Sequence, residues 1–281
     1  MKSNSAILFL IFGTVLFQTH GLALNRTYEG PQQARTARLT AEHSSQHKTI
    51  SQPRIVLWAW THDEDFSFID PKTTAIAFYA GTLVLGSETA TLCRRKNKLF
   101  IPKSCHHFPV FRIENAHPTE AATDEAFKVA LRLISEYCET HPTNKLQIDF
   151  DASLLDRPAY LNFLQAVRKK FGDKKAVSIT ALASWCHGDR WLADAPVDEA
   201  VAMFFSLGQG KEEALNLLSK EISITGGKYD QSLGFSVSET ETNSVLIKSA
   251  SMKSAKHIYA FSSLGWTKQR YEYMLEEVAN K

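Results

Sequence analysis

Two aspartates, Asp149 and Asp151, stand one residue apart in the otherwise apolar stretch KLQIDFDAS (145–153). Because side chains alternate along a β-strand, a strand here would turn both carboxyl groups to one side and the apolar side chains to the other. Carboxyl groups that share a buried site cannot all ionise easily, so the pKa of at least one should be raised. A general acid needs such a raised pKa.

The stretch FPVFRIEN (108–115) repeats this alternation and turns Arg112 and Glu114 to one side. If the two stretches are neighbouring strands of a barrel, these side chains share its interior with the aspartates. Because buried charges are costly unless paired, we expect Arg112 to neutralise Asp149 or Glu114. An ion-pair network without chemistry is the alternative interpretation of Arg112 and Asp149. Glu114 and Asp151 would lie at the open carboxyl-end face, where barrel enzymes keep their active sites.

The elements that must position these residues follow from periodicity. Eight short apolar or β-branched stretches predict strands at 54–60, 75–81, 108–114, 145–151, 176–183, 199–205, 232–238 and 256–262. Helical spacing predicts helices at 119–140, 156–171, 210–222 and 267–280, with weaker helical or irregular stretches at 62–74, 186–196 and 241–254. This alternation predicts an α/β fold, a single (β/α)8 TIM-type barrel, with a short β-hairpin-like insertion after the second strand. A doubly wound sheet is the alternative, but no Gly-rich phosphate turn follows an early strand.

All five tryptophans fall at or just beyond the ends of predicted strands. An indole offers a broad apolar face that suits stacking against a sugar ring. The residues expected to contact a ligand at the open face are Trp60, Arg112, Trp185, Trp191, Trp266 and His187. Trp58 is also explained by core packing alone. Glu239, just past the seventh strand, serves the site only if that strand ends by Ser238.

The N-terminus predicts export. Lys2 precedes an apolar run of roughly twelve residues, shorter than the ~20 that cross a bilayer as a helix, so residues 1–23 read as a signal peptide. We expect residues 24–53 to be a flexible lead-in and residues 54–281 to be the barrel domain. We expect a periplasmic or secreted protein without an integral membrane segment after signal removal. Of the cysteines, Cys93 and Cys105 are expected to form a disulfide, and Cys138 is expected to be a buried thiol.

The chain resembles a known family in the motifs RIVLWAW, LQIDFDA, SITALASWCHGD and PVDEAVAMFF. They are similar to those of the bacterial family called Domain of Unknown Function 3142, over nearly the whole chain from Arg54. The resemblance implies a barrel with a glycosidase-like character and no established activity. The family pattern has a proline after VDEAV and an arginine a few residues later, where this chain has Ala202 and Ser206.

More distantly, IDFDAS resembles the fourth-strand motif of chitinase-type barrel hydrolases, which ends in a catalytic glutamate. Ser153 stands in the place of that glutamate. Asp151 would therefore have to take the role of the acid.

The main hypothesis is an exported glycoside hydrolase-like protein that acts on an envelope or extracellular polysaccharide. Asp151 is its candidate acid, Glu239 or Glu114 lies opposite, and Asp149 with Arg112 sets the charge state of the acid. A non-catalytic carbohydrate-binding or envelope-assembly barrel is the alternative. It predicts that sugar binding survives the loss of Asp151.

A third hypothesis is metal-dependent hydrolysis by the two aspartates with His62 or His187. No clustered Cys/His signal supports it, so neither a metal nor another cofactor is predicted. Nucleic acid is not an expected partner, because 32 basic and 30 acidic residues give a formal net charge of only +2.

Overall fold

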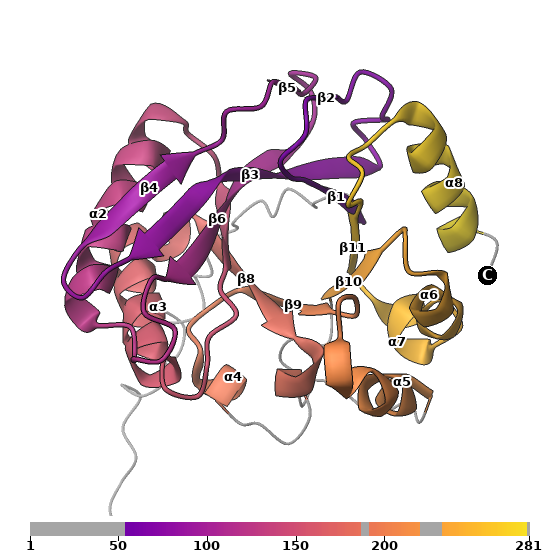
Figure 1. Cartoon of the computed structure of the whole chain (residues 1–281). Helices are drawn as coiled ribbons and strands as arrows, with labels where there is room; N and C mark the ends of the chain where they lie inside the picture. The colour runs from indigo at the N-terminus through magenta and orange to yellow at the C-terminus, as the bar shows by residue number, and fades with distance from the viewer. Residues whose placement is uncertain (1–53, 187–190, 220–231, 280–281) are drawn as a thin grey trace, which may run out of the picture. The chain divides into compact units, whose positions relative to one another are not determined.

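The computed structural model describes residues 54–186, 191–219 and 232–279. Eight parallel strands form the barrel, namely β1 (Ile55–Ala59), β3 (Thr74–Leu85), β6 (His107–Asn115), β7 (Lys145–Asp149), β8 (Ala176–Leu182), β9 (Glu199–Met203), β10 (Ser232–Ser236) and β11 (His257–Phe261). The first strand pairs with both β3 and β11, which closes the ring seen end-on in Figure 1. The predicted barrel is confirmed, with a strand at each of the eight predicted places. The predicted signal peptide and lead-in lie outside the described residues.

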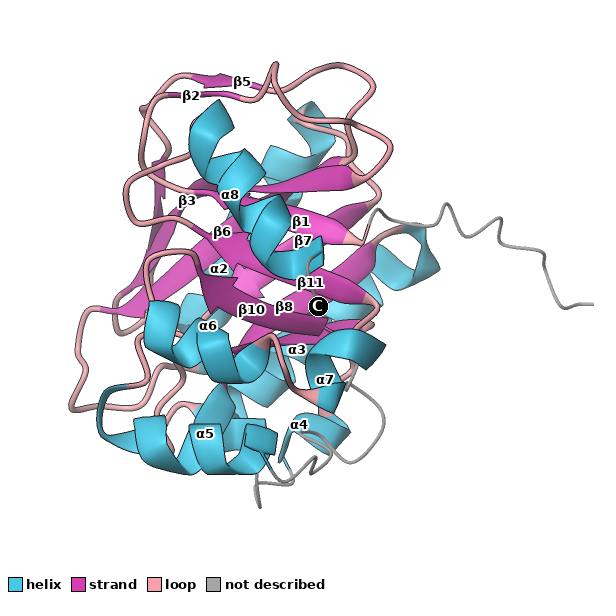
Figure 2. Cartoon of the chain, turned by 90° about the vertical axis from the view of Figure 1, so that its right-hand side faces the viewer, coloured by secondary structure: helices cyan, strands magenta, loops and turns pink. Residues whose placement is uncertain are grey.

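Helices cover the outside of the barrel after its third and later strands (Figure 2). They are α2 (Asp124–Thr140), α3 (Arg157–Phe171), α4 (Trp191–Asp194), α5 (Lys211–Ser219), α6 (Thr240–Leu246), α7 (Ala250–Ser254) and α8 (Lys268–Ala279), with 3-10 turns η1 (Gly172–Lys174), η2 (Ala183–Cys186) and η3 (Gly208–Gly210). Local sequence explains where they begin. Thr123 caps α2 by accepting a hydrogen bond from the Ala126 N–H, and Pro158 stands in the first turn of α3. Within the part of the chain that the structure describes, no helix is long and apolar enough to cross a membrane.

The first two crossovers, where every residue is described, use loops and short strands in place of helices. β4 (Ala90–Arg94) folds back antiparallel on β3, and β5 (Leu99–Phe100) pairs with β2 (Glu64–Asp65). This is the insertion predicted after the second strand. The basic stretch CRRKNK contributes more than polar surface, because Arg95 donates hydrogen bonds to the carbonyl oxygens of Ala59, Trp60 and His62. Arg95 thereby holds the chain that leaves β1.

The predicted pairing of Cys93 with Cys105 is wrong, because both cysteines are free. Cys93 is exposed on β4, whereas Cys105 is buried and its thiol points to the carbonyl oxygens of Thr74 and His106. Proximity in sequence did not bring the two sulfur atoms together, because the short segment between them runs from an outer strand to the amino end of the barrel. Cys138 is buried on α2, as predicted.

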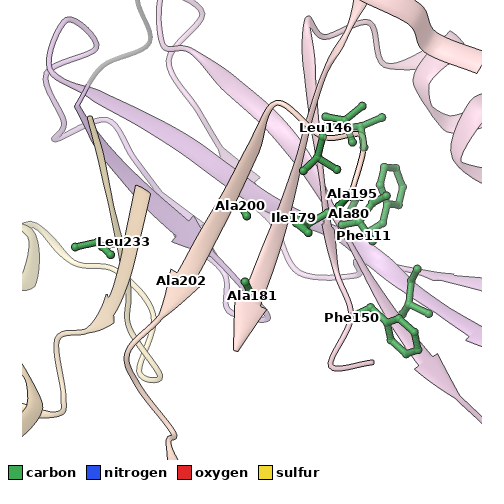
Figure 3. Close-up of a cluster of buried hydrophobic side chains, with 14 of the residues drawn as sticks. Ala80, Phe111, Leu146, Phe150, Ile179, Ala181, Ala195, Ala200, Ala202 and Leu233 are labelled. Carbon is green, nitrogen blue, oxygen red and sulfur yellow. The ribbon is translucent and has the colours of Figure 1, made fainter. Parts of the chain in front are cut away.

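Two apolar layers hold the fold together. The outer layer lies between strands and helices, and Figure 3 shows part of it, with Leu146, Ile179 and Phe111 on the outward faces of neighbouring strands. The inner layer fills the barrel and consists of Val56, Trp58, Ala75, Ala77, Phe108, Val110, Val201 and Tyr259. Trp58 crosses this interior: its Nε1 donates to Gln147 Oε1 at 2.7 Å, and a Cβ atom at Gly234 would lie 2.6 Å from its ring. The glycine on β10 therefore makes room for the indole.

A polar network closes the amino end of the barrel around the carboxylate of Glu199. The carboxylate accepts hydrogen bonds of 2.5–2.7 Å from five side chains, those of Lys145, Ser178, Ser232, His257 and Tyr259. Burial raises the pKa of Glu199, but Lys145 and His257 outweigh burial and hold it well below the usual value. The buried charges at the amino end are therefore paired with one another, as a structural network requires. In barrels of this type the active site lies at the opposite, carboxyl end.

Candidate active site

One wall of the carboxyl-end mouth of the barrel is acidic. Arg112 on β6 lies in register with Asp149, the last residue of β7, and its Nη1 is 3.8 Å from Asp149 Oδ2. The same guanidinium donates from Nε to Glu114 Oε1 at 2.9 Å. Thr180 on β8 donates to Asp149 Oδ1 at 2.7 Å. The structure therefore brings Arg112, Glu114 and Asp149 together as predicted, and Asp151 is an exposed residue in the loop after β7.

Asp149 and Asp151 differ in how deeply they are buried, and therefore in how far their pKa values rise. Asp149 is only 8 % exposed, and burial raises its pKa to about 6, against the opposing effects of Thr180 and Arg112. Burial also raises the pKa of Asp151, and Arg112 opposes that rise. Sequence reasoning assigned the role of acid to Asp151, whereas the structure gives the larger rise to Asp149. The two carboxyl groups interact, so their protonation is a property of the pair.

The rest of the mouth is aromatic. Trp60, just after β1, lies 5.1 Å from Tyr79 and 6.3 Å from Phe261 between ring centroids, and Phe261 stacks on Phe205 at 5.4 Å. All four side chains are half-buried, so part of each remains open. They come from β3, β11 and the chain just beyond β1 and β9, and these strands with β10 complete the ring that contains β6, β7 and β8. The mouth thus has an acidic wall facing an aromatic wall.

Sequence reasoning named only Trp60 from the aromatic wall. Tyr79 stands in phase with the inward positions of β3, Phe205 with those of β9, and Phe261 with those of β11. Strand alternation therefore contained a signal for these three residues. Tryptophan was not the only aromatic residue at the inward positions, and the same period of two identifies tyrosine and phenylalanine there.

The other predicted platform residues lie elsewhere, which corrects that prediction. Trp266 is 5 % exposed and donates from Nε1 to the carbonyl oxygen of Trp58 at 2.9 Å. Trp185 is 3 % exposed and packs edge-on against Trp191 at 5.0 Å, with the Arg157 guanidinium over both rings. Burial of a large apolar ring stabilises the fold in proportion to the area removed from water, and both indoles are buried in the core. Trp191 stays half-buried on α4, and His187 lies outside the described residues.

Neither predicted partner of Asp151 stands opposite it as a free carboxylate. Glu114 is bound to Arg112 on β6, the strand beside β7, and so lies on the same wall. β10 ends at Ser236, which meets the condition set for Glu239. Glu239 precedes α6, and its Oε1 accepts a hydrogen bond from the Ser206 N–H at 2.9 Å.

Ser153, in the place of the glutamate of the chitinase-type motif, is turned toward the start of α3. Its hydroxyl donates to Asp156 Oδ2 at 2.5 Å, and the buried Asp156 also accepts from the Ala122 N–H at 2.8 Å. Ser153 is therefore occupied in fixing the loop that carries Asp151.

Metal ligation was the third hypothesis for this mouth. Across 54–186, 191–219 and 232–279, no group of three or more His, Cys, Asp or Glu side chains is placed to hold a metal ion. Of the two histidines proposed with the aspartates, His62 is described and belongs to no such group, whereas His187 falls in the gap between these ranges. The metal-dependent alternative stays a prediction.

Comparison with known proteins adds evidence on the fold. No family model and no curated protein matches the sequence. The catalytic domain of a family GH18 chitinase from the fern Peteris ryukyuensis matches with a TM-score of 0.51 at 10 % identity, over 78 % of this chain and 99 % of that chain. A protein named provisionally as chitinase A of Streptomyces coelicolor also gives 0.51 at 10 % identity, over 81 % and 96 %. The two matched structures share the (β/α)8 barrel architecture of this chain. At this identity the likeness concerns the fold alone.

Proposed function

We propose that the chain is an exported glycoside hydrolase-like protein that binds an envelope or extracellular polysaccharide in the barrel mouth and cleaves it with paired carboxyl groups. The signal-like N-terminus and the resemblance to the Domain of Unknown Function 3142 family support export from a bacterial cell. Two proteins of similar fold are described as chitinases, which supports a polysaccharide as the ligand.

One observation carries the proposal: a buried carboxyl group, Asp149, faces an aromatic wall across the mouth of a barrel. A sugar ring has apolar C–H faces, which pack on aromatic rings, and hydroxyl groups around its edge, which bind carboxylates. Burial raises the pKa of both Asp149 and Asp151, so the pair holds a proton closer to neutral pH than a free carboxyl group does. In this arrangement Asp151, the exposed member of the pair, protonates the leaving oxygen as the glycosidic bond breaks, and a water molecule adds to the anomeric carbon. The ionised form of Asp149, beside Arg112, accepts the proton that the water gives up, and its charge also acts on Asp151.

A specific observation favours the alternative, a sugar-binding barrel without catalysis. Ser153 replaces the glutamate of the chitinase-type motif, and its hydroxyl is bound to Asp156. The same mouth could then bind a polysaccharide through its aromatic wall and leave the glycosidic bond intact. The two functions differ only in what happens after binding.

The test is a polysaccharide binding and hydrolysis screen with the chain purified without residues 1–23. Asp151→Asn removes the acid and keeps the shape of the side chain, and Trp60→Ala removes the centre of the aromatic wall. Asp173→Asn is the matched control, because Asp173 is an exposed aspartate in the 3-10 turn before β8, at the opposite end of the barrel.

Hydrolysis that is lost in Asp151→Asn, with binding kept, supports the enzyme. The sugar-binding alternative is supported if Trp60→Ala loses binding, if Asp151→Asn and Asp173→Asn bind as the unmodified chain does, and if none of these proteins releases a product. No binding to any polysaccharide, in a chain that is folded, rules out both.

A further inference from the structure

A pocket of about 210 Å³ opens beside the mouth, between the carboxyl ends of β8 and β9 and the start of α5. Its lining is largely apolar and includes Leu182, Met203, Phe205, Leu207 and Ala214. If each non-hydrogen atom of a ligand occupies about 30 Å³, the volume of one water molecule in the liquid, the pocket holds roughly seven such atoms. The pocket is half-enclosed and continuous with the surface, so a ligand can enter it without opening the barrel.

The pocket shares residues with the proposed sugar site. Phe205 belongs to the aromatic wall, and Leu182 lies two residues beyond Thr180, the hydrogen-bond partner of Asp149 on β8. A ligand bound against both walls therefore has the pocket at its side. Among the described residues, the polar side chains of the lining are those of Ser184, Ser206 and Glu213, so the pocket fits an apolar group better than another sugar hydroxyl.

One rim of the pocket stands in an unfavourable backbone conformation. Ser206 has φ 53°, in the left-handed region that residues with a Cβ rarely adopt. The Glu239 carboxylate, 33 residues along the chain and just before α6, accepts the hydrogen bond of the Ser206 N–H at 2.9 Å. Glu239 thus fixes the loop that supplies Phe205, Ser206 and Leu207 to the pocket.

We propose that this pocket is a subsite for an apolar group carried by the sugar ligand, such as an alkyl or aryl group of about six or seven non-hydrogen atoms, and that Glu239 is the positioning residue that holds its rim. The inference rests on the proposed function, because it places the sugar in the adjoining mouth. It also gives Glu239 a role other than the catalytic one expected from the sequence.

The ligand is tested by NMR on protein labelled in the methionine methyl groups. Met203 lines the pocket, whereas Met252 and Met274 are buried in the outer core and report on non-specific effects. We expect n-hexyl glucoside and n-hexanol to shift the Met203 signal to saturation, and methyl glucoside to leave it in place. The inference is overturned if hexyl glucoside leaves Met203 unmoved, if methyl glucoside shifts it equally, or if all three signals move together.

The positioning role is tested by rescue. Glu239→Ala should weaken hexyl glucoside binding about five- to tenfold, which corresponds to roughly 1–1.4 kcal/mol. Glu239→Gln should bind like the unmodified chain, because its amide oxygen still accepts the Ser206 hydrogen bond. Ser206→Gly added to Glu239→Ala should restore binding, because glycine adopts positive φ without the steric cost. Equal binding by Glu239→Ala, or no rescue by Ser206→Gly, refutes the positioning role, and unchanged Met252 and Met274 signals show that each variant is folded.

This titration and the polysaccharide screen fail independently. If the chain binds polysaccharide but the Met203 signal does not respond to hexyl glucoside, the subsite is refuted and the proposed function stands. A Met203 that responds to hexanol in a chain that binds no sugar removes the proposed function and leaves a pocket for an apolar ligand.

Discussion

Replacement of Asp149 by asparagine should stabilise the fold at alkaline pH. The pKa of Asp149 rises from 3.8 in the unfolded chain to about 6 in the folded one, chiefly through burial. A shift of about 2 units corresponds to roughly 3 kcal/mol of free energy. The folded state binds this proton more tightly than the unfolded state does. The buried carboxylate therefore destabilises the folded state by the full amount above pH 6, and this destabilisation disappears as the pH falls toward 3.8. Asparagine removes the charge and can still accept the Thr180 hydrogen bond.

The assay is urea denaturation followed by tryptophan fluorescence at pH 8 and pH 4. We expect Asp149→Asn to raise the free energy of unfolding by up to about 3 kcal/mol at pH 8 and to change it little at pH 4. Asp173→Asn, an exposed control, should change neither value by more than about 0.5 kcal/mol. An Asp149→Asn variant that is no more stable than the unmodified chain at pH 8 would refute the reasoning, because Arg112 would then fully compensate the buried carboxylate.

Three further outcomes are expected. Glu199→Gln should lower the free energy of unfolding by about 3–5 kcal/mol at pH 7, as for a broken buried ion pair; because its folded pKa lies well below 4.5, this loss should shrink as the pH falls below 4.5, and a constant difference would contradict it. Gly234→Ala should cost about 1–3 kcal/mol by overpacking the central indole, whereas Gly210→Ala, with no atom within 4 Å of its Cβ, should cost nothing in thermal melts. In a Cys186→Ser background, which leaves only described cysteines, Cys93→Ser should abolish the fast thiol reaction with an aromatic disulfide reagent, since Cys93 is exposed and burial raises the pKa of Cys105 to about 11; an unchanged fast phase would contradict this assignment.

Local sequence patterns were sufficient to predict the strands of the barrel. Each barrel strand is a short apolar run, and inward positions differ from outward ones along the chain, so the eight strands and the placement of Arg112, Glu114 and Asp149 on one interior face could be predicted. The reason is that burial and backbone geometry act on a period of two residues within a strand. Such signals need no knowledge of any distant segment.

Contacts between distant segments were not accessible in this way. Trp185 and Trp266 stand just beyond strand ends, as Trp60 does, yet the first two are buried and Trp60 is half-open. Which indole is covered depends on the loop that packs over it, and no local pattern records that loop. The same limit applied to Cys93 and Cys105, whose separation in space differs from their separation in sequence.

The sequence by itself determined a barrel of eight strands and a pair of aspartates at the carboxyl end of its fourth, because alternation and helix spacing are local properties. Tertiary structure alone decided that Asp149 is the deeper carboxyl group, that aromatic side chains from four strands face it, and that Glu239 is bound to the Ser206 N–H. Closure of the ring sets the depth of each side chain and joins residues far apart in the chain, and depth governs the pKa of a carboxyl group.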